Sequence, residues 1–171
     1  MDEVDRLVGA FRTRAAASVR SKLDVLMGFE QICDARVTPF FLNVLEDRQE
    51  PVEVRAYVLQ QLRCSGGSLP PAERHRVANA LGSVMIDRSS PDLQLQAALA
   101  LGDFAQLDGV LSRLNAICLM DDASIDLRYA AFTSIERAGP IPESIVLLRR
   151  MVDDETLGRS ARSVLSAWHI G

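Results

Sequence analysis

Two stretches of similar sequence decide the fold, SPDLQLQAALAL at residues 90–101 and SIDLRYAAFTSI at residues 124–135. Each begins with a serine suited to a helix N-cap and continues with an acid in the first turn. In both stretches, apolar residues recur at steps of three and four, which is typical of the buried face of a helix. The copies align with a spacing of 34 residues, and such a spacing indicates helical repeats.

Three other stretches fit the same frame, so the pattern extends over nearly the whole chain. Its anchor positions are Arg20, Arg55, Gln94, Arg128 and Gly158. A first helix that ends in aspartate precedes the anchored helix, as in residues 37–47 and 141–154. One helix pair cannot bury its own apolar stripe, so the pairs are expected to stack on one another.

This pattern resembles HEAT repeats, including the bacterial kind related to phycobilin lyase subunits. The residues that carry the resemblance are Pro39, Asp47, Val54 and Arg55 and, in part, Asp121, Leu127, Arg128 and Ala131. The departures are Gln94 and Gly158 in place of the arginine and Val58 in place of the small residue.

The resemblance implies an all-α fold, a right-handed α-α superhelix (HEAT-like solenoid) of about five helix pairs. It implies a single repeat domain over residues 1–171. The repeats are expected at residues 3–33, 35–66, 69–106, 108–139 and 141–170.

Composition and charge restrict the classes of partner and compartment. Apolar residues make up 48% of the chain, and the net charge of −4 disfavours a duplex-binding surface. The first twenty residues carry too many charges for a signal peptide, and no apolar run has membrane-spanning length. Three widely spaced cysteines are expected as reduced, buried residues. We therefore expect a cytoplasmic protein that does not act at a membrane.

The sequence offers little for catalysis. HEAT-like iron hydroxylases carry repeated His-Glu dipeptides, whereas the two histidines here, His75 and His169, form none. No phosphate loop or nucleophile motif occurs. The aspartates in the turns are interpreted as partners in ion pairs, Asp47 with Arg55, and Asp121 or Asp122 with Arg128. We therefore expect no catalytic residue, metal or cofactor, and no enzyme.

One basic stretch stands out, because residues 6–22 contain no acid. The hypothetical basic patch comprises Arg12, Arg14, Arg20 and Lys22. Helical-repeat alkylpurine glycosylases hold DNA against a basic concave face, which suggests nucleic acid as one ligand. The acidic total and the lack of interleaved aromatics favour an anionic protein segment or a plain solvated helix face instead.

The resemblance places the second helix of each pair on a concave surface that binds partners. Aromatic residues and arginines are enriched at binding hot spots, so the candidate contacts are Tyr57, Arg63, Tyr129 and Arg137. The leading expectation is a non-catalytic adaptor or scaffold for another protein. The alternatives are a subunit or chaperone of a bilin lyase-type enzyme and a nucleic-acid-binding, glycosylase-like domain. The last helix is apolar and includes Trp168, so it could pair weakly with a second copy. We therefore expect a monomer or a weak homodimer.

Overall fold

The computed structural model describes residues 1–13 and 18–171, and over this part of the chain it contains helices and no strand. The predicted all-α class is confirmed. The α-helices are α1 (Glu3–Thr13), α2 (Val19–Met27), α3 (Val37–Glu46), α4 (Val52–Ser65), α5 (Pro71–Met85), α6 (Pro91–Leu101), α7 (Val110–Cys118), α8 (Ile125–Arg137), α9 (Pro142–Met151) and α10 (Gly158–Ala167). None of these helices is both long and apolar enough to cross a membrane.

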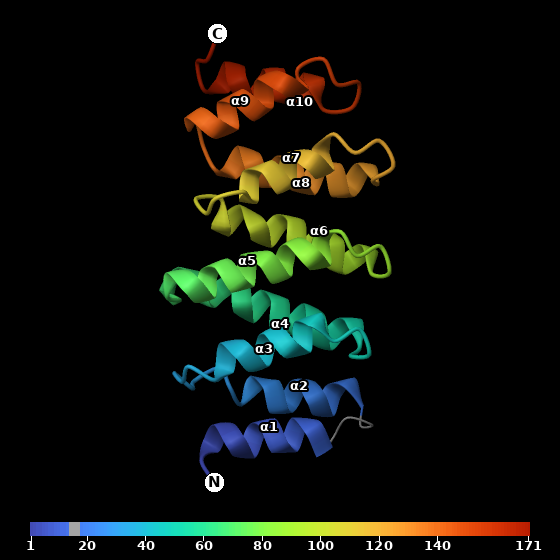
Figure 1. Ribbon diagram of the computed structural model, residues 1–171. Helices are drawn as coiled ribbons and strands as arrows, with labels where there is room; N and C mark the ends of the chain where they lie inside the picture. Colours follow the sequence, from blue (N-terminus) through green and yellow to red (C-terminus); the bar gives the residue numbers. More distant parts are fainter. Residues whose placement is uncertain (14–17) are drawn as a thin grey trace. The chain divides into compact units, whose positions relative to one another are not determined.

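The chain divides into two compact units, residues 1–80 and residues 81–171, and the division falls within α5. The prediction of a single repeat domain over residues 1–171 stays a prediction. Each unit is built from helices that follow one another in chain order (Figure 1).

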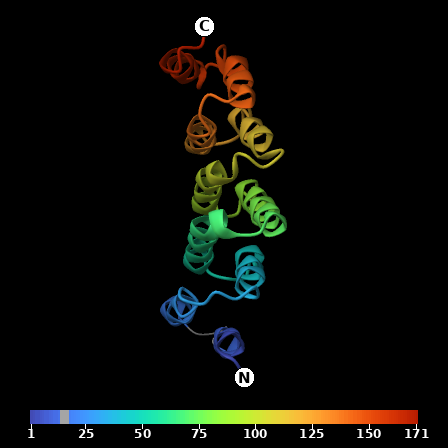
Figure 2. The same cartoon turned by 90° about the vertical axis from the view of Figure 1, so that its left-hand side faces the viewer.

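In the N-terminal unit, α1 and α3 lie in one layer and α2 and α4 in the other (Figure 2). Helix α2 packs on α4, and α3 packs on α4. The core between the layers is rich in phenylalanine, with Phe11, Phe29, Phe40 and Phe41 all buried. Burial of large aromatic rings contributes much of the hydrophobic stabilisation of so small a unit.

In the C-terminal unit, α6, α8 and α10 lie in one layer and α7 and α9 in the other (Figure 2). The core includes the fully buried side chains of Leu101, Phe104, Leu111 and Ile135. Ala131, on α8, also has no exposed surface. A small side chain at that position lets neighbouring helices approach closely, as the repeat pattern predicts.

A polar side chain at the fourth position of the second helix recurs from pair to pair. In three pairs it donates a hydrogen bond to a carbonyl at the end of the first helix: Arg55 Nε to Leu45 O at 2.8 Å, Gln94 Nε2 to Met85 O at 2.8 Å and Arg128 Nε to Cys118 O at 2.7 Å. The last carbonyls of a helix lack hydrogen-bond donors within the helix, and these side chains act as the donors. This contact explains why the pattern requires a long polar residue there.

The helix starts show that two anchor positions of the sequence alignment, Arg20 and Gly158, are not the fourth residues of their helices. The N-cap of α2 is Ser18, so the residue at the fourth position is Lys22 and not Arg20. In the last pair, Ala161 takes the fourth position of α10. The next residue, Arg162, donates to the carbonyl of Val152.

The predicted ion pairs within each turn are wrong. Arg128 pairs with Asp154, whose carboxylate lies 2.9 Å away, and Asp122 pairs with Arg88 at 2.6 Å. The reason is geometric: the Nε of Arg128 is already bonded to the carbonyl that ends α7, so its outer nitrogens point to the turn of the following pair. Asp47 accepts the backbone N–H of Gln49.

Candidate functional site: a pocket in the N-terminal unit

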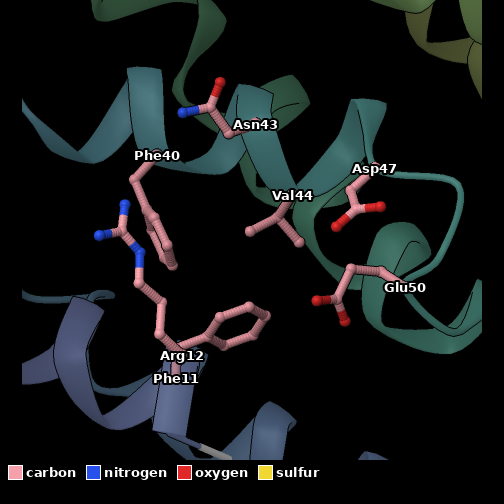
Figure 3. Close-up of a pocket in the computed structure, with 7 residues that line it drawn as sticks. All are labelled: Phe11, Arg12, Phe40, Asn43, Val44, Asp47 and Glu50. Carbon is pink, nitrogen blue, oxygen red and sulfur yellow. The ribbon is translucent and has the colours of Figure 1, made fainter. Parts of the chain in front are cut away.

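A pocket of about 270 Å³ lies in the N-terminal unit, between the end of α1, one face of α3 and the turn that follows α3 (Figure 3). Its walls combine aromatic, aliphatic, amide and charged groups. The lining residues are Phe11, Arg12, Phe40, Asn43, Val44, Asp47 and Glu50.

Helical spacing brings the α3 residues of the pocket to one face. Phe40, Asn43 and Val44 stand three and four residues apart, and Asp47 follows as the C-cap residue. Glu50 comes next in the turn, where its backbone N–H donates to the carbonyl of Asp47 at 3.1 Å. The pocket therefore has an apolar part along α3 and an acidic part where that helix ends.

The aromatic wall is held by ring packing. The rings of Phe11 and Phe40 meet edge to face, with centroids 5.4 Å apart and an angle of 87° between the planes. Phe29 supports Phe40 from the core side, at a centroid distance of 5.1 Å. Edge-to-face pairs are a favourable arrangement of aromatic rings, so this wall exists without a ligand.

A buried ion pair links the pocket to α2. The ammonium group of Lys22 lies 2.6 Å from the carboxylate of Glu50, and the two side chains are only 4% and 11% exposed. The same ammonium lies 5.2 Å from the centroid of the Phe11 ring, within the range of a cation–π contact. Lys22 therefore holds two lining residues, Phe11 and Glu50, in place.

Two other charged groups of the pocket remain available to a ligand. Within the described residues, the Arg12 guanidinium forms no hydrogen bond or ion pair. The Asp47 carboxylate accepts one backbone N–H, from Gln49 at 2.9 Å. Figure 3 shows Arg12 beside Phe40 on one side of the pocket, and Asp47 and Glu50 on the other. The pocket thus presents opposite charges at its two sides.

A binding role for the hypothetical basic patch stays a prediction. Arg12 and Arg20 are exposed, and Arg14 lies outside the described residues. Lys22 was assigned wrongly to this patch, because its side chain is buried and paired with Glu50. Charge counting along the chain cannot detect that pair, since the two residues stand 28 positions apart.

Two of the four predicted partner-binding residues, Tyr57 and Arg63, lie on α4 in the N-terminal unit. Both are half-buried. The Tyr57 hydroxyl donates to the carboxylate of Glu30. Partial burial, and then this carboxylate, raise the pKa of Tyr57 above its ordinary value. Tyr57 is therefore engaged within its own unit.

The other two, Tyr129 and Arg137, lie on α8 in the C-terminal unit. Both are exposed, and both make contacts within the unit. The Tyr129 hydroxyl donates to the carbonyl of Thr156 at 3.1 Å, and Arg137 donates to the carbonyl of Leu99 at 3.1 Å and pairs with Asp103. A binding role for the four residues stays a prediction.

Sequence reasoning did not identify the pocket. It assigned Asp47 to an ion pair with Arg55, and it left Phe40, Asn43 and Glu50 without a role. One signal was present in the sequence: counting four residues from Ser18 aligns Lys22 with the buried arginines of the later copies. A buried lysine requires a buried acid nearby, and that requirement leads to the turn after α3.

No cluster of three or more histidine, cysteine or acidic side chains suited to a metal occurs in the part of the chain that the structure describes. No protein-family model matches the chain, and no curated protein matches it. Among solved structures, it is similar to human deoxyhypusine hydroxylase in complex with glycerol, with 15% sequence identity and a TM-score of 0.45. The match covers 98% of this chain and 96% of the hydroxylase chain.

This comparison corrects the functional expectations drawn from the sequence. The chain was expected to be a non-catalytic adaptor or scaffold and not an enzyme. The protein that it matches is an enzyme, and this finding contradicts both expectations. The chain is an all-α protein of successive helix pairs, and its N-terminal unit holds a pocket with polar and aromatic walls.

Proposed function

We propose that the N-terminal unit binds a small organic molecule in the pocket between α1 and α3. The observation that carries the proposal is the pair of available charges, Arg12 and Asp47, on either side of an aromatic wall. Binding sites for small molecules are concave and largely apolar, with a few polar groups that fix the orientation of the ligand. This pocket has that composition.

The pocket's size and rigidity support the same proposal. Pockets for drug-sized ligands have volumes of about 300–1,000 Å³, so a pocket of about 270 Å³ suits a smaller molecule. The walls are fixed before binding by the ring packing of Phe11 and Phe40 and by the Lys22–Glu50 pair. A preformed site loses less conformational entropy when a ligand enters.

The test is a ligand-observed NMR screen of the full chain against small aromatic amines, acids and zwitterions. Asn43→Trp fills the pocket from the exposed side of α3 and is expected to abolish binding of the hits. Glu46→Trp is the matched control, because Glu46 is exposed on the same helix and does not line the pocket. The proposal fails if no compound binds, or if the hits bind the Asn43→Trp variant as well as the wild type.

We also propose that the chain is a HEAT-like repeat protein. The recurrence of Arg55, Gln94 and Arg128 at one helix position, each on the last carbonyls of the preceding helix, supports this. The substitutions of Arg55 described below test the structural role of that position. The three cysteines are free thiols, but only Cys118 is buried as expected, and Cys33 and Cys64 are exposed. We propose the cytosol as the compartment, since thiols stay reduced there, and fractionation of the native cells would test it.

A further inference from the structure

Three large apolar side chains are exposed in two turns of the C-terminal unit. Ile86 follows α5, Leu119 follows α7 and Ile125 begins α8, and these side chains are 64%, 41% and 61% exposed. Turns between helices usually carry polar residues or glycine. Neighbouring apolar side chains that stay exposed on a folded unit mark a surface that binds a partner.

Side-chain contacts hold these turns beside one another. The Arg88 guanidinium lies 2.6 Å from the carboxylate of Asp122 and 3.9 Å from the sulfur of Met120, so it joins the turn after α5 to the turn after α7. Arg128 lies 2.9 Å from Asp154 and joins the start of α8 to the turn after α9. Figure 1 shows the three turns along one edge of the unit. Their side chains therefore belong to one surface.

The same surface is strongly acidic. Residues 86–92, 119–126 and 152–157 contain eight acids and one base, whereas the whole chain has a net charge of −4. Two of these acids, Asp122 and Asp154, are held in ion pairs. Three others are exposed and form no hydrogen bond or ion pair within the described residues: Asp121, Asp153 and Glu155. The exposed apolar side chains therefore lie among carboxylates that are available to a cationic partner.

We propose that this turn surface, formed by Ile86, Leu119, Asp121, Ile125, Asp153 and Glu155, docks a basic, amphipathic peptide segment of another protein. Lysine or arginine side chains of the segment pair with the three carboxylates. Apolar side chains between them cover the two isoleucines and Leu119. Complementary charge selects the partner and speeds its association, and burial of apolar surface supplies affinity.

The charge of the turn surface disfavours other occupants. Nucleic acids and anionic membranes carry phosphate groups, which the unpaired carboxylates repel. A two-fold dimer through this surface would place the same carboxylates of two copies against each other, because the same patch faces itself in such an interface. The surface belongs to the C-terminal unit and the pocket to the N-terminal unit, so each proposal can be tested without the other.

The experiment begins with a phage-displayed library of random linear peptides, from which binders of the full chain are selected. The expected result is enrichment of peptides that combine several lysines or arginines with large apolar residues. Fluorescence anisotropy then gives the Kd of the most enriched peptide. That Kd is expected to rise at least about tenfold between about 0.1 M and about 1 M salt, because the Debye length falls from about 10 Å to about 3 Å.

Two double variants locate the bound peptide. Ile86→Ser with Ile125→Ser is expected to raise the Kd at least about tenfold, since it removes apolar contact area. Asp121→Asn with Glu155→Gln is expected to raise it about threefold to tenfold, since exposed ion pairs contribute less.

The matched controls change exposed residues of the same unit outside the turn surface. They are Ile141→Ser with Val146→Ser and Glu136→Gln with Glu143→Gln. Both controls are expected to leave the Kd unchanged. Circular dichroism of each variant checks that the helices are retained.

Several outcomes would overturn the proposal. They are a selection that yields no binding peptide, enriched peptides without basic residues, and controls that weaken binding as much as the turn variants do. Sedimentation velocity of the wild type and of Ile86→Ser with Ile125→Ser tests for a second copy on this surface. We expect the two to sediment alike. A wild-type dimer that the double variant abolishes would make a second copy the occupant and overturn the proposal.

Discussion

The ammonium group of Lys22 lies 2.6 Å from the carboxylate of Glu50, in a contact that joins α2 to the turn between α3 and α4. Both side chains are buried, so neither charge is well solvated. Taking two charges out of water costs free energy, and their mutual attraction offsets that cost only while both are present. Glu50 lines the pocket and Lys22 does not. One wall of the pocket therefore depends on Lys22, a residue outside the lining.

Replacing Lys22 with Met is expected to destabilise the N-terminal unit by about 3–5 kcal/mol, since it leaves the Glu50 carboxylate buried without its partner. Urea unfolding, followed by circular dichroism, measures the loss. The double substitution Lys22→Met with Glu50→Gln is expected to recover much of it. Arg20→Met is the control and should change stability little. A loss no larger than that of Arg20→Met would show that the pair contributes nothing.

Replacing Arg55 with Leu removes the donor that serves the carbonyl of Leu45. A buried acceptor left without a donor costs about 1–3 kcal/mol, so the free energy of unfolding should fall by that amount. Arg55→Gln is expected to cost less, because Gln94 serves the corresponding carbonyl of Met85 at the same distance. Urea unfolding of both variants decides the point. Equal losses for Leu and Gln would argue against a shared role for this helix position.

Replacing Asp154 with Asn is expected to reduce the dependence of stability on acid pH. Backbone N–H groups of Leu157 and Thr156, together with Arg128, lower the pKa of Asp154 in the folded protein. A lowered pKa contributes stability that is present above the unfolded pKa of about 3.9 and is lost as the pH falls through the folded pKa.

The measurement is the free energy of unfolding of the wild type and Asp154→Asn between neutral pH and strong acid. The difference between them should be constant at neutral pH and should shrink below pH about 4. A difference that persists unchanged in strong acid would contradict this assignment.

Replacing Ala131 with Leu is expected to overpack α8 and to cost about 1–3 kcal/mol, because the side chain has no exposed surface. Thermal unfolding measures the effect. Ala116→Leu, at an exposed position of α7, is the matched control and should have a small effect. Similar melting temperatures for the two variants would mean that Ala131 does not mark a close helix contact.

The fold was predictable because its determinants are local. The apolar spacing of α6 and α8 is visible in the sequence, and Ser124 caps α8 as expected, accepting the N–H of Leu127 at 3.1 Å. Ser90 also precedes its helix, although its side chain forms no capping hydrogen bond. Such signals lie within a few residues of one another, so they can be found without the structure.

The pocket was not predictable because it joins residues that are far apart in sequence. Phe11 meets Phe40 across 29 positions, and Lys22 meets Glu50 across 28. No short motif marks either contact. The sequence also presents Lys22 as one more charge in a basic stretch, and only the position of the helix start shows that it points into the core.

The proposed function requires that the pocket of the N-terminal unit bind a small organic ligand. The most direct measurement is an amide NMR titration of the isotopically labelled full chain with the tightest-binding compound from the ligand-observed screen. We expect saturable shifts that concentrate on the amides of Phe11, Phe40, Val44 and Asp47 and that disappear in the Asn43→Trp variant. The absence of shifts, or shifts that persist in Asn43→Trp, would contradict it.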